Sequence, residues 1–464
     1  MKTTKYFKLL IFALICMGIV LMYENAKEEE DFLQNLELEN QASVQSEDST
    51  DAYQAIRVLI TDSDDEAYEL YSMKIQSKVP MVVTGAMNVT IPANVELDVS
   101  EILASGEQIR IQTTQNGVGI TIKSLKKDGK NPTYEGILEI SNQNGAYRLI
   151  NEVGLETYLK YVVPSEMPSG YPEEALKAQA VCARTYAIRQ IADQKLKKYN
   201  ADVDDTVNYQ VYAHISPQKS TTQAVKDTEG QIITYEGEAI EAYFFSTSCG
   251  FTSGIEVWNQ EKVVPYLSAV SLSSLDRIDT EVFSQTKGIL SETAFVSHIK
   301  SSNTNDLEKS EAWYRWQVTF SWENLKNRVY DRYPEIGQLQ SVKILKRSTG
   351  GAVISLELRG KNGTAYLDNE YDIREFFSPK KQTVILQDGS EAPRQKILPS
   401  AYFYLTTRYE NSKVSGLQLN GGGYGHGVGM SQNGAKYMAE NGMTWREIIQ
   451  RFYQNITIVD VRQG

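Results

Sequence analysis

Cysteine and histidine are scarce in this chain of 464 residues, which contains three of each. The cysteines are Cys16, Cys182 and Cys249. Because Cys16 lies in an N-terminal apolar segment, the folded part can form at most one disulfide, and the chain is not a disulfide scaffold. The histidines are His214, His298 and His426, and none has a second His or Cys at the usual spacing of zinc ligands. We therefore assign no metal and no cofactor.

Basic residues are also fewer than acidic residues. Lys and Arg number 47 against 59 Asp and Glu, which gives a net charge of −12 and a pI near 5.1. A phosphate backbone requires a basic protein face, so the charge argues against nucleic acid as the main partner, whereas a neutral polysaccharide is compatible with it. The nucleophile elbow Gly-x-Ser-x-Gly is absent too. A catalytic triad that includes Ser246 and His426 is conceivable, but it would lack the sequence motif that usually presents the serine.

Tyrosine, by contrast, is abundant, with 28 residues against 13 Phe and 5 Trp. A tyrosine ring can lie on the face of a sugar while its hydroxyl bonds the sugar edge, although surface β-sheets use much tyrosine as well. Hydrophobic residues make up 41% and charged residues 23%, which is typical of a folded soluble protein. The length suggests two to three domains.

The N-terminus carries a short apolar run, from Leu9 to Met22, behind three lysines and ahead of an acidic stretch that starts at Glu24. This charge order predicts an N-terminus in the cytoplasm and a body on the extracytoplasmic side. We expect residues 1–23 to be a membrane anchor or a signal segment. No small-x-small cleavage site follows closely, which favours an anchor, whereas cleavage would export the body. Residues 24–54, rich in Glu, Gln, Asn and Ser, are expected to form a flexible stalk.

The body shows two hydrophobic periods. Short alternating runs between Ile56 and Ile150 predict strands, with turns at Asp128-Gly129 and Asn144-Gly145. The period then changes, and Leu155–Val162 predicts a short helix and Pro172–Lys198 a long one, with Pro172 at its first position. We therefore expect an α+β fold in which mixed, mostly antiparallel strands surround one long helix.

The C-terminal half predicts further strands at Gln231–Tyr235, Ala242–Ser246, Trp313–Trp322, Val342–Lys346 and Ala352–Leu358. We divide the body into a first part of the core, 55–274, an inserted sub-domain, 275–395, and a C-terminal part of the core, 396–464. The inserted sub-domain contains no catalytic motif. In the last part, Thr444 and Glu447 form a capping box that opens the final helix.

Glu166 is the first candidate for chemistry, because it lies between Pro164 and Pro168, directly before the predicted long helix. Prolines fix their own φ and restrict the preceding residue, so we expect the carboxyl on a stiff, irregular loop. Met167 and two valines make its surroundings apolar, and apolar surroundings raise a carboxyl pKa enough for general-acid work. Taken alone, the segment fits a capping or solvent-exposed glutamate better.

Four further segments contain candidate binding residues. In Gln179–Tyr186, helical spacing places Arg184 and Tyr186 on different faces. Gln210 and Tyr212 end a polar loop that begins at Asp204. Tyr243–Ser253 gathers hydroxyls, including Ser246 and Ser248, that could bond sugar hydroxyls or N-acetyl groups. A core-packing helix and a simple turn are the plainer alternatives for these segments.

The last segment, Gly421–Gln432, includes Tyr424, His426 and Gln432. Its alternating glycines allow the backbone to approach a ligand or another strand closely. It is not a phosphate-binding loop, because no Lys-Ser/Thr follows and no βαβ frame precedes it.

These segments, in this order, resemble the stage II sporulation protein D (SpoIID)/LytB family. The matching stretches are Tyr161–Pro168, Ala175–Ala187, Gln210–Tyr212, Tyr243–Ser253 and Gly422–Gln432. The resemblance covers roughly residues 55–275 and 395–460, and it leaves 275–395 unexplained.

The resemblance implies a lytic transglycosylase, which cleaves the MurNAc–GlcNAc β-1,4 bond of peptidoglycan and leaves a 1,6-anhydro end. It further implies strands stripped of their stem peptides by an amidase partner, a role in engulfment during sporulation, and Glu166 as the catalytic glutamate. One carboxyl is enough for this reaction, because the C6 hydroxyl of the sugar itself attacks, whereas an ordinary glycosidase needs two. Glu166 would act first as acid and then as base.

The substrate-binding candidates are Arg184, Tyr186, Gln210, Tyr212, Ser246, Ser248, Tyr424, His426 and Gln432. Some relatives have Cys and His in the loop before Gln-Val-Tyr and bind zinc, but here that loop reads Asp204–Tyr209 without either residue, so we assign no zinc. Two other interpretations remain open. The chain could be a non-catalytic amidase enhancer or wall-binding protein, or a structural protein in which Glu166 is only a loop cap.

Overall fold

The computed structural model describes residues 55–62, 67–272, 291–301 and 305–463. The expected anchor or signal segment, the expected stalk and Cys16 lie outside these ranges. Within them, no helix combines the length and the apolar character needed to cross a bilayer. The chain divides into two units, residues 1–52 with 462–464 and residues 53–461. The second unit contains the sheets and helices described below.

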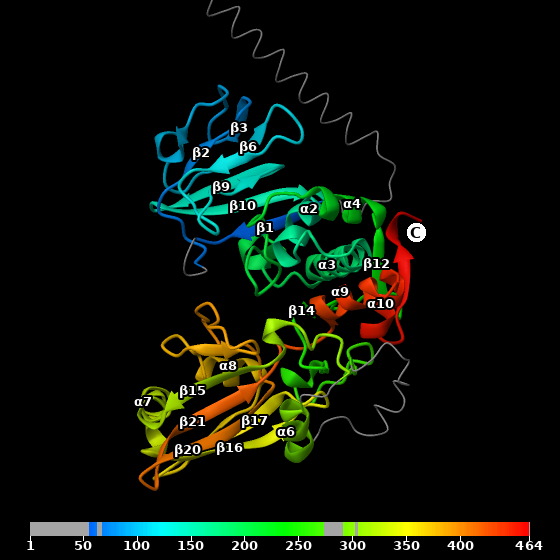
Figure 1. Cartoon of the computed structure of the whole chain (residues 1–464). Coiled ribbons are helices and arrows are strands. Elements are labelled where there is room, and N and C mark those ends of the chain that lie inside the picture. The colour runs from blue at the N-terminus through cyan, green and yellow to red at the C-terminus, as the bar shows by residue number, and fades with distance from the viewer. Residues whose placement is uncertain (1–54, 63–66, 273–290, 302–304, 464) are drawn as a thin grey trace, which may run out of the picture. The chain divides into compact units, whose positions relative to one another are not determined.

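The described part of the chain is α+β, as predicted, with eight helices and six sheets whose strands are mostly antiparallel (Figure 1). The largest sheet has the strand order β11-β1-β10-β9-β6-β3-β4. Its strands are β11 (Val203–Asp204), β1 (Ala55–Ile60), β10 (Ala146–Gly154), β9 (Ile137–Gln143), β6 (Gln108–Thr113), β3 (Met81–Gly85) and β4 (Val89–Ile91). All neighbours are antiparallel except β1 and β11.

The alternating runs of the first part form this sheet because every second side chain enters one core. Ile56, Val58 and Ile60 of β1 are fully buried in a cluster that also takes in the smaller sheet β5-β2-β7-β8. The strands of that sheet are β5 (Leu97–Asp98), β2 (Lys74–Gln76), β7 (Ile120–Ile122) and β8 (Thr133–Tyr134). Asn144 and Gly145 both have positive φ, 56° and 86°, as a two-residue hairpin between β9 and β10 requires. The predicted turn is confirmed.

Helix α2 (Leu155–Glu166) is longer than the predicted Leu155–Val162 and ends at the candidate carboxyl. Glu166 is therefore the last helical residue, and its expected place on an irregular loop is wrong. Pro164 fits inside the final turn because its fixed φ is compatible with a helix. Pro168 restricts Met167 to an extended conformation (φ −132°, ψ 133°), which ends the helix there.

Helix α3 (Glu173–Asp193) is the longest described helix, with 21 residues. It ends five residues before the predicted Lys198, because Gln194 adopts the left-handed conformation (φ 51°). Pro172 is its N-cap rather than its first residue. Helix α3 contacts α2, α4 (Lys219–Asp227), α9 (Gln432–Glu440), α10 (Trp445–Phe452) and β12 (Gln231–Tyr235), so its surroundings are largely helical. The capping box at Thr444 and Glu447, predicted to open α10, is confirmed.

Two small sheets join segments that are far apart in the sequence. Strand β12 lies between β13 (Glu238–Ala239) and β23 (Thr457–Asp460). Strand β14 (Phe244–Phe245) pairs in parallel with β22 (Met430–Ser431). Strand β14 is shorter than the predicted Ala242–Ser246, because the chain on both sides of it leaves the ladder. The β14–β22 pairing brings the hydroxyl-rich segment next to the glycine-rich one.

Most of the region from residue 313 to 421 packs around its own core, which includes Trp316, Phe320, Leu356 and Phe403, whereas Phe295 and Ile299 of the preceding helix are buried in the neighbouring core. It has two sheets, β19 (Val384–Leu386)-β15 (Trp316–Ser321)-β21 (Lys413–Gly421)-β20 (Phe403–Glu410) and β16 (Leu339–Arg347)-β17 (Val353–Gly360)-β18 (Thr364–Leu367). Its helices are α7 (Trp322–Arg332) and α8 (Glu370–Phe376), and the preceding helix is α6 (Glu292–Lys300). Because β15 pairs with β21, the first sheet extends past residue 395. The predicted domain boundaries stay a prediction.

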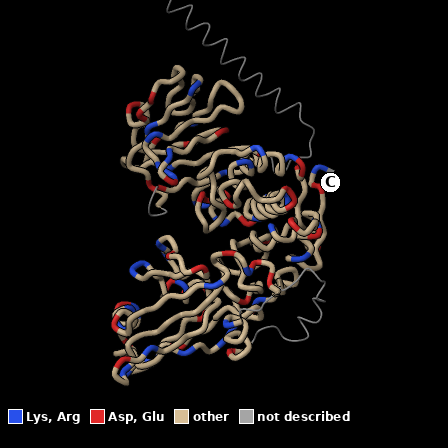
Figure 2. The backbone as a smooth tube through the Cα atoms, in the orientation of Figure 1, with Lys and Arg blue, Asp and Glu red and all other residues tan. Residues whose placement is uncertain are grey.

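Charged residues are spread over strands, helices and loops (Figure 2), and few are buried. Lys127 and Asp205 are an exception, with side chains only 6% and 0% exposed and 2.9 Å between Nζ and Oδ2. Thr61 adds two hydrogen bonds to Asp205, of 3.0 and 2.8 Å from its N–H and Oγ1. This cluster fixes the start of the loop that leads from β11 to residue 215.

We expect Lys127→Met to lower the free energy of unfolding by about 3–5 kcal/mol, because it leaves the Asp205 carboxylate buried without its cation. Chemical denaturation measures the change. Lys126→Met, at the exposed neighbouring position, is the control and should stay within about 0.5 kcal/mol of wild type. Equal stability of the two variants would contradict the structural role of the pair.

Candidate functional site

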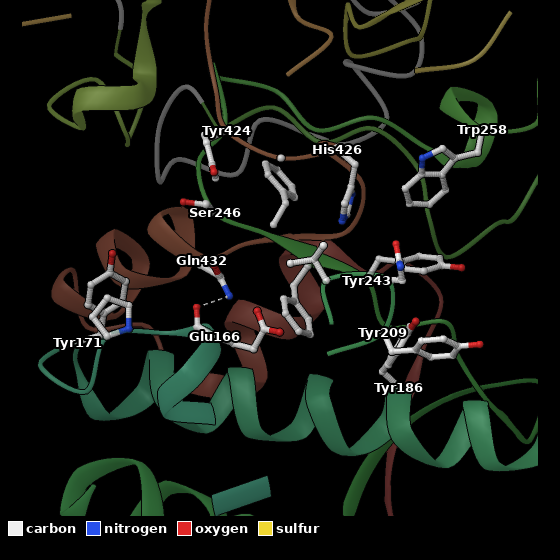
Figure 3. A pocket seen from close by; sticks show the side chains of 16 residues that line it. Glu166, Tyr171, Tyr186, Tyr209, Tyr243, Ser246, Trp258, Tyr424, His426 and Gln432 are labelled. Atoms are coloured by element: carbon white, nitrogen blue, oxygen red, sulfur yellow. Dashed lines mark hydrogen bonds between the residues drawn. The ribbon is translucent and has the colours of Figure 1, made fainter. Parts of the chain in front are cut away.

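A pocket of about 510 Å³ lies beside the C-terminal end of α2. Aromatic and polar side chains from six separate segments converge on it (Figure 3). The labelled lining residues are Glu166, Tyr171, Tyr186, Tyr209, Tyr243, Ser246, Trp258, Tyr424, His426 and Gln432. The pocket therefore collects Glu166 and five of the nine predicted binding residues, namely Tyr186, Ser246, Tyr424, His426 and Gln432.

The glycine-rich segment forms one wall of the pocket because its backbone packs directly on the hydroxyl-rich segment. Gly423, Gly425, Gly427 and Gly429 all have positive φ, between 76° and 112°. A Cβ at Gly429 would lie 2.0 Å from the Tyr243 carbonyl oxygen, and one at Gly425 would lie 2.7 Å from Cβ of Phe245. Only glycine meets both the conformation and the spacing here.

Glu166 faces the pocket and has few polar partners. Its Oε1 accepts a hydrogen bond of 2.6 Å from the Val211 N–H, and its backbone carbonyl accepts one of 3.1 Å from Nε2 of Gln432 (Figure 3). Burial raises the pKa of the carboxyl from 4.5 to about 7, while the Val211 N–H works in the opposite direction. Glu166 forms no ion pair with any residue that the structure describes. The apolar setting predicted for this carboxyl is present.

Gln210 and Tyr212 hold the Val211 N–H in place but do not line the pocket. Oε1 of Gln210 accepts a 3.1 Å hydrogen bond from the Tyr158 hydroxyl, and Nε2 donates 3.3 Å to the Ala183 carbonyl. The Tyr212 hydroxyl donates 2.7 Å to Asn151. Both side chains are fully buried. Gln210 and Tyr212 were predicted to contact substrate, and the structure instead gives them a positioning role. Because both side chains are anchored in the core, the N–H of Val211 between them faces Glu166.

Arg184 is a second correction, because its side chain is fully buried away from the pocket. Its Nε and Nη2 donate hydrogen bonds of 2.6 and 2.8 Å to Glu156, and further bonds reach the carbonyls of Val225 and Gln231. It therefore ties α2 and α3 to α4 and β12. Tyr186 is on another face of α3, as the helical spacing predicted, and lines the pocket.

Ser248 is a third correction. Unlike Ser246, which lines the pocket, Ser248 is buried and donates from its N–H and Oγ to Glu308, at 2.8 and 2.7 Å. Ser431, the N-cap of α9, also donates to Glu308. Burial raises the pKa of Glu308 to about 8. The sequence gives no signal for Glu308, because it lies in a region without a recognisable motif.

His426 lines the pocket as a neutral ring. Its Nδ1 accepts a 3.1 Å hydrogen bond from the Val428 N–H, which leaves the proton on Nε2. Burial, together with the charge of Arg374, lowers its pKa to about 3. The ring packs against Tyr243 and Trp258, with centroids 6.2 and 5.0 Å away. Its remaining ring N–H bonds to the backbone of Phe244, so we infer that His426 contributes shape to the pocket rather than a titrating base.

Six aromatic lining residues were not among the predicted site residues, namely Tyr171, Tyr209, Tyr243, Phe244, Phe245 and Trp258. The singled-out segment Tyr243–Ser253 contains three of them, the abundance of tyrosine is the only signal for Tyr171 and Tyr209, and Trp258 had none. Cys182 and Cys249 are both free, buried thiols, so the one disulfide open to the folded part is not formed. Across the described ranges, no three His, Cys, Asp or Glu side chains are grouped as a metal site requires.

The chemistry available to this pocket follows from its one acid. Among its described lining residues, Glu166 is the single carboxyl group. The remaining residues offer aromatic faces, hydroxyls and amides, which are suited to an uncharged, hydroxylated ligand. A retaining or inverting glycosidase requires a second carboxyl across the scissile bond, and the pocket does not supply one.

Comparison with known proteins gives two matches to family models. Residues 143–235 match the model of a stage II sporulation protein domain, SpoIID. Residues 253–429 match a domain of unknown function, DUF8618. The first match covers α2, α3 and the loop that carries Val211. The second covers the region with its own core and most of the glycine-rich segment.

Three curated proteins are similar over much of the chain. An uncharacterised protein of Brachyspira hyodysenteriae is 28% identical over 396 residues, which is 85% of this chain and 88% of that protein. The stage II sporulation protein D of Bacillus amyloliquefaciens is 29% identical over 358 residues, 73% of this chain and 83% of that protein. The amidase enhancer of Bacillus subtilis is 29% identical over 316 residues, 65% of this chain but only 40% of that protein.

We expect Glu166→Gln to stabilise the fold at alkaline pH. The folded-state pKa lies above the ordinary value, so wild type loses stability relative to the variant as pH rises from 4.5 through about 7. At pH 8 the variant should be more stable by roughly 2 kcal/mol, since partial solvent exposure reduces the full effect. At pH 4 the two should be equal. Chemical denaturation at both pH values measures the stability difference, with the surface variant Glu261→Gln as control. A wild type that gains stability relative to Glu166→Gln between pH 4 and pH 8 would contradict the raised pKa of Glu166.

Proposed function

The chain belongs to the stage II sporulation protein D (SpoIID) family, and on that premise we propose that it is a peptidoglycan lytic transglycosylase. It would cleave the bond between MurNAc and GlcNAc in glycan strands freed of their peptides and leave 1,6-anhydro ends. The observation that carries the proposal is Glu166, the single carboxyl among the described lining residues of an aromatic pocket, with a pKa raised to about 7.

The proposed reaction uses this one group twice. Protonated Glu166 gives its proton to the glycosidic oxygen as the bond to C1 of MurNAc breaks, which leaves an oxocarbenium-like sugar. The resulting carboxylate then takes the proton of the C6 hydroxyl, and the C6 oxygen forms a bond to C1. The acid is restored, and no water is consumed. A pKa near 7 suits both steps, because neither protonation state is strongly disfavoured at neutral pH.

The single hydrogen bond to Glu166 supports this cycle. Burial favours the neutral acid before the substrate is cleaved, while the Val211 N–H stabilises the carboxylate in the second step. The tyrosines and Trp258 offer flat surfaces for sugar rings, and Ser246 and Asn208 offer polar atoms for their edges. These contacts would orient C6 toward C1.

The cellular setting is part of the proposal. Relatives named stage II sporulation protein D support a role in sporulation. We propose that the body acts outside the membrane, anchored by residues 1–23 or exported if these are removed, and that a cell-wall amidase acts with it to strip the strands. Peptidoglycan glycan would be the main partner.

A second candidate function is that of a non-catalytic amidase enhancer or wall-binding protein. The similarity to the amidase enhancer of Bacillus subtilis favours it. Under this function the pocket would bind strands, and Glu166 would have no acid role.

We expect purified protein to release 1,6-anhydro products from peptide-free glycan strands, detected by mass spectrometry. Glu166→Gln should lower the rate at least about 100-fold, because it keeps the acceptor for Val211 but removes the acid. Glu241→Gln, a carboxyl that bonds the Tyr243 hydroxyl at 3.1 Å outside the lining, is the matched control and should stay active. Strand binding without products, or stimulation of an added amidase alone, would favour the second candidate.

The pH dependence follows from the acid step. We expect kcat to fall as pH rises above about 7, approaching tenfold per unit, because the reaction starts from protonated Glu166. Initial rates of anhydro product formation between pH 5 and 9 measure this. A rate that rises steadily through that range would rule out Glu166 as the acid.

A further inference from the structure

A second surface outside the pocket has the chemistry to bind a glycan. The sheet β19-β15-β21-β20 is covered on one face, where Trp316, Val318 and Phe320 enter the core with α7. The other face is open, and Gln317, Thr319 and Ser321 alternate with those buried residues along β15.

The open face is a network of amides and hydroxyls. Strand pairing places Gln317, Asn420 and Tyr404 in one row and Thr319, Gln418 and Thr406 in the next. Nε2 of Gln418 donates to Gln317 at 2.6 Å and to Asn420 at 3.1 Å. Nδ2 of Asn420 donates to Oγ1 of Thr406 at 3.2 Å. These bonds fix the amides across three strands, so the face is preorganised for hydrogen bonding.

The face is also hollowed. A cavity of about 230 Å³ includes Tyr404, Asn420 and Gln317 in its lining, and a second of about 560 Å³ includes Gln317, Gln418 and Arg408. The two share Gln317 and Ile385 in their linings, so they lie side by side on this face, and we call them together the groove. The second shares Lys381 with a third cavity of about 670 Å³. The groove is therefore suited to an extended ligand.

The charges around this groove are mainly positive, although the whole chain carries −12. Arg408 and Lys381 line the second cavity, and Lys300 lies 5.4 Å above the ring of Tyr404 at the other end. Glu391 is the one carboxyl in the described lining of these two neighbouring cavities. The strands themselves carry few charged residues (Figure 2).

We propose that this groove is a second glycan-binding surface, specific for strands whose stem peptides have been removed. The inference rests on the proposed substrate class. Removal of the peptide leaves a free lactyl carboxylate on every MurNAc, which gives the strand regularly spaced negative charges. The amides bind hydroxyl and N-acetyl groups, the Tyr404 ring contacts a sugar face, and Arg408 and Lys381 pair with lactyl carboxylates.

Binding is tested in a catalytically silent background, so that the strand is not cut. Glu166→Gln protein is titrated with peptide-free glycan strands, and Arg408→Glu and Lys381→Glu are added separately. Each should raise the Kd roughly tenfold, because each replaces a charge-assisted contact with a repulsive one. Lys343→Glu on β16, an exposed lysine with the same charge change, is the matched control and should leave the Kd unchanged.

The amides and the Tyr404 ring, which are the uncharged part of the surface, are tested with an uncharged ligand. A β-1,4-linked GlcNAc oligomer lacks lactyl carboxylates, so its weaker binding should be insensitive to Arg408→Glu but reduced by Tyr404→Ala. Circular dichroism of each variant verifies the fold.

Unchanged strand affinity in Arg408→Glu, Lys381→Glu and Tyr404→Ala would overturn the proposal. Loss of binding to an added amidase with unchanged strand affinity would also overturn it, in favour of a protein partner. Failure of the proposed reaction is a separate result, since products are measured on the wild type and strand binding on Glu166→Gln.

Discussion

The 2.6 Å hydrogen bond between the Val211 N–H and the Glu166 carboxyl is the contact on which the site depends. It links the end of α2 to the loop that follows β11. Three buried anchors fix that loop, namely Asp205 with Lys127, Gln210 with Tyr158, and Tyr212 with Asn151. Because a donor in an apolar pocket lowers the cost of an ionised carboxyl without abolishing it, this contact keeps the acid usable in both protonation states. The core that buries the anchors thus determines the chemistry of the carboxyl.

Local sequence patterns predicted much of the fold because their physical causes are local. The alternation of apolar and polar residues determines which side chains of β1 enter the core, and Asn144-Gly145 supplies the positive φ of a tight hairpin. The site was harder to predict. Strand β14 pairs with β22 through a contact between distant segments, so the sequence alone does not reveal that Trp258 and Tyr171 share a pocket with His426. Arg184 belongs to a segment that matches the family, yet its pairing with Glu156 is visible only once α2 and α3 are packed.

The two surfaces would divide the handling of one polymer between them. Acid catalysis requires a desolvated carboxyl, and desolvation calls for aromatic walls, as around Glu166. Retaining a long strand requires no desolvation, and exposed amides and cations are well suited to it because many weak contacts add along a polymer. The pocket and the sheet face therefore differ in composition for a physical reason, although both would recognise the same sugars.

The glycine-rich wall of the pocket has a consequence for drug resistance. Inhibitors usually lose potency when a target exchanges the side chain that they contact. Gly425, which lines the pocket, offers no such side chain, and a Cβ there would come 2.7 Å from Cβ of Phe245. A compound that binds the main chain of this wall would thus face few viable escape mutations, because those that displace the compound would also disrupt the pocket.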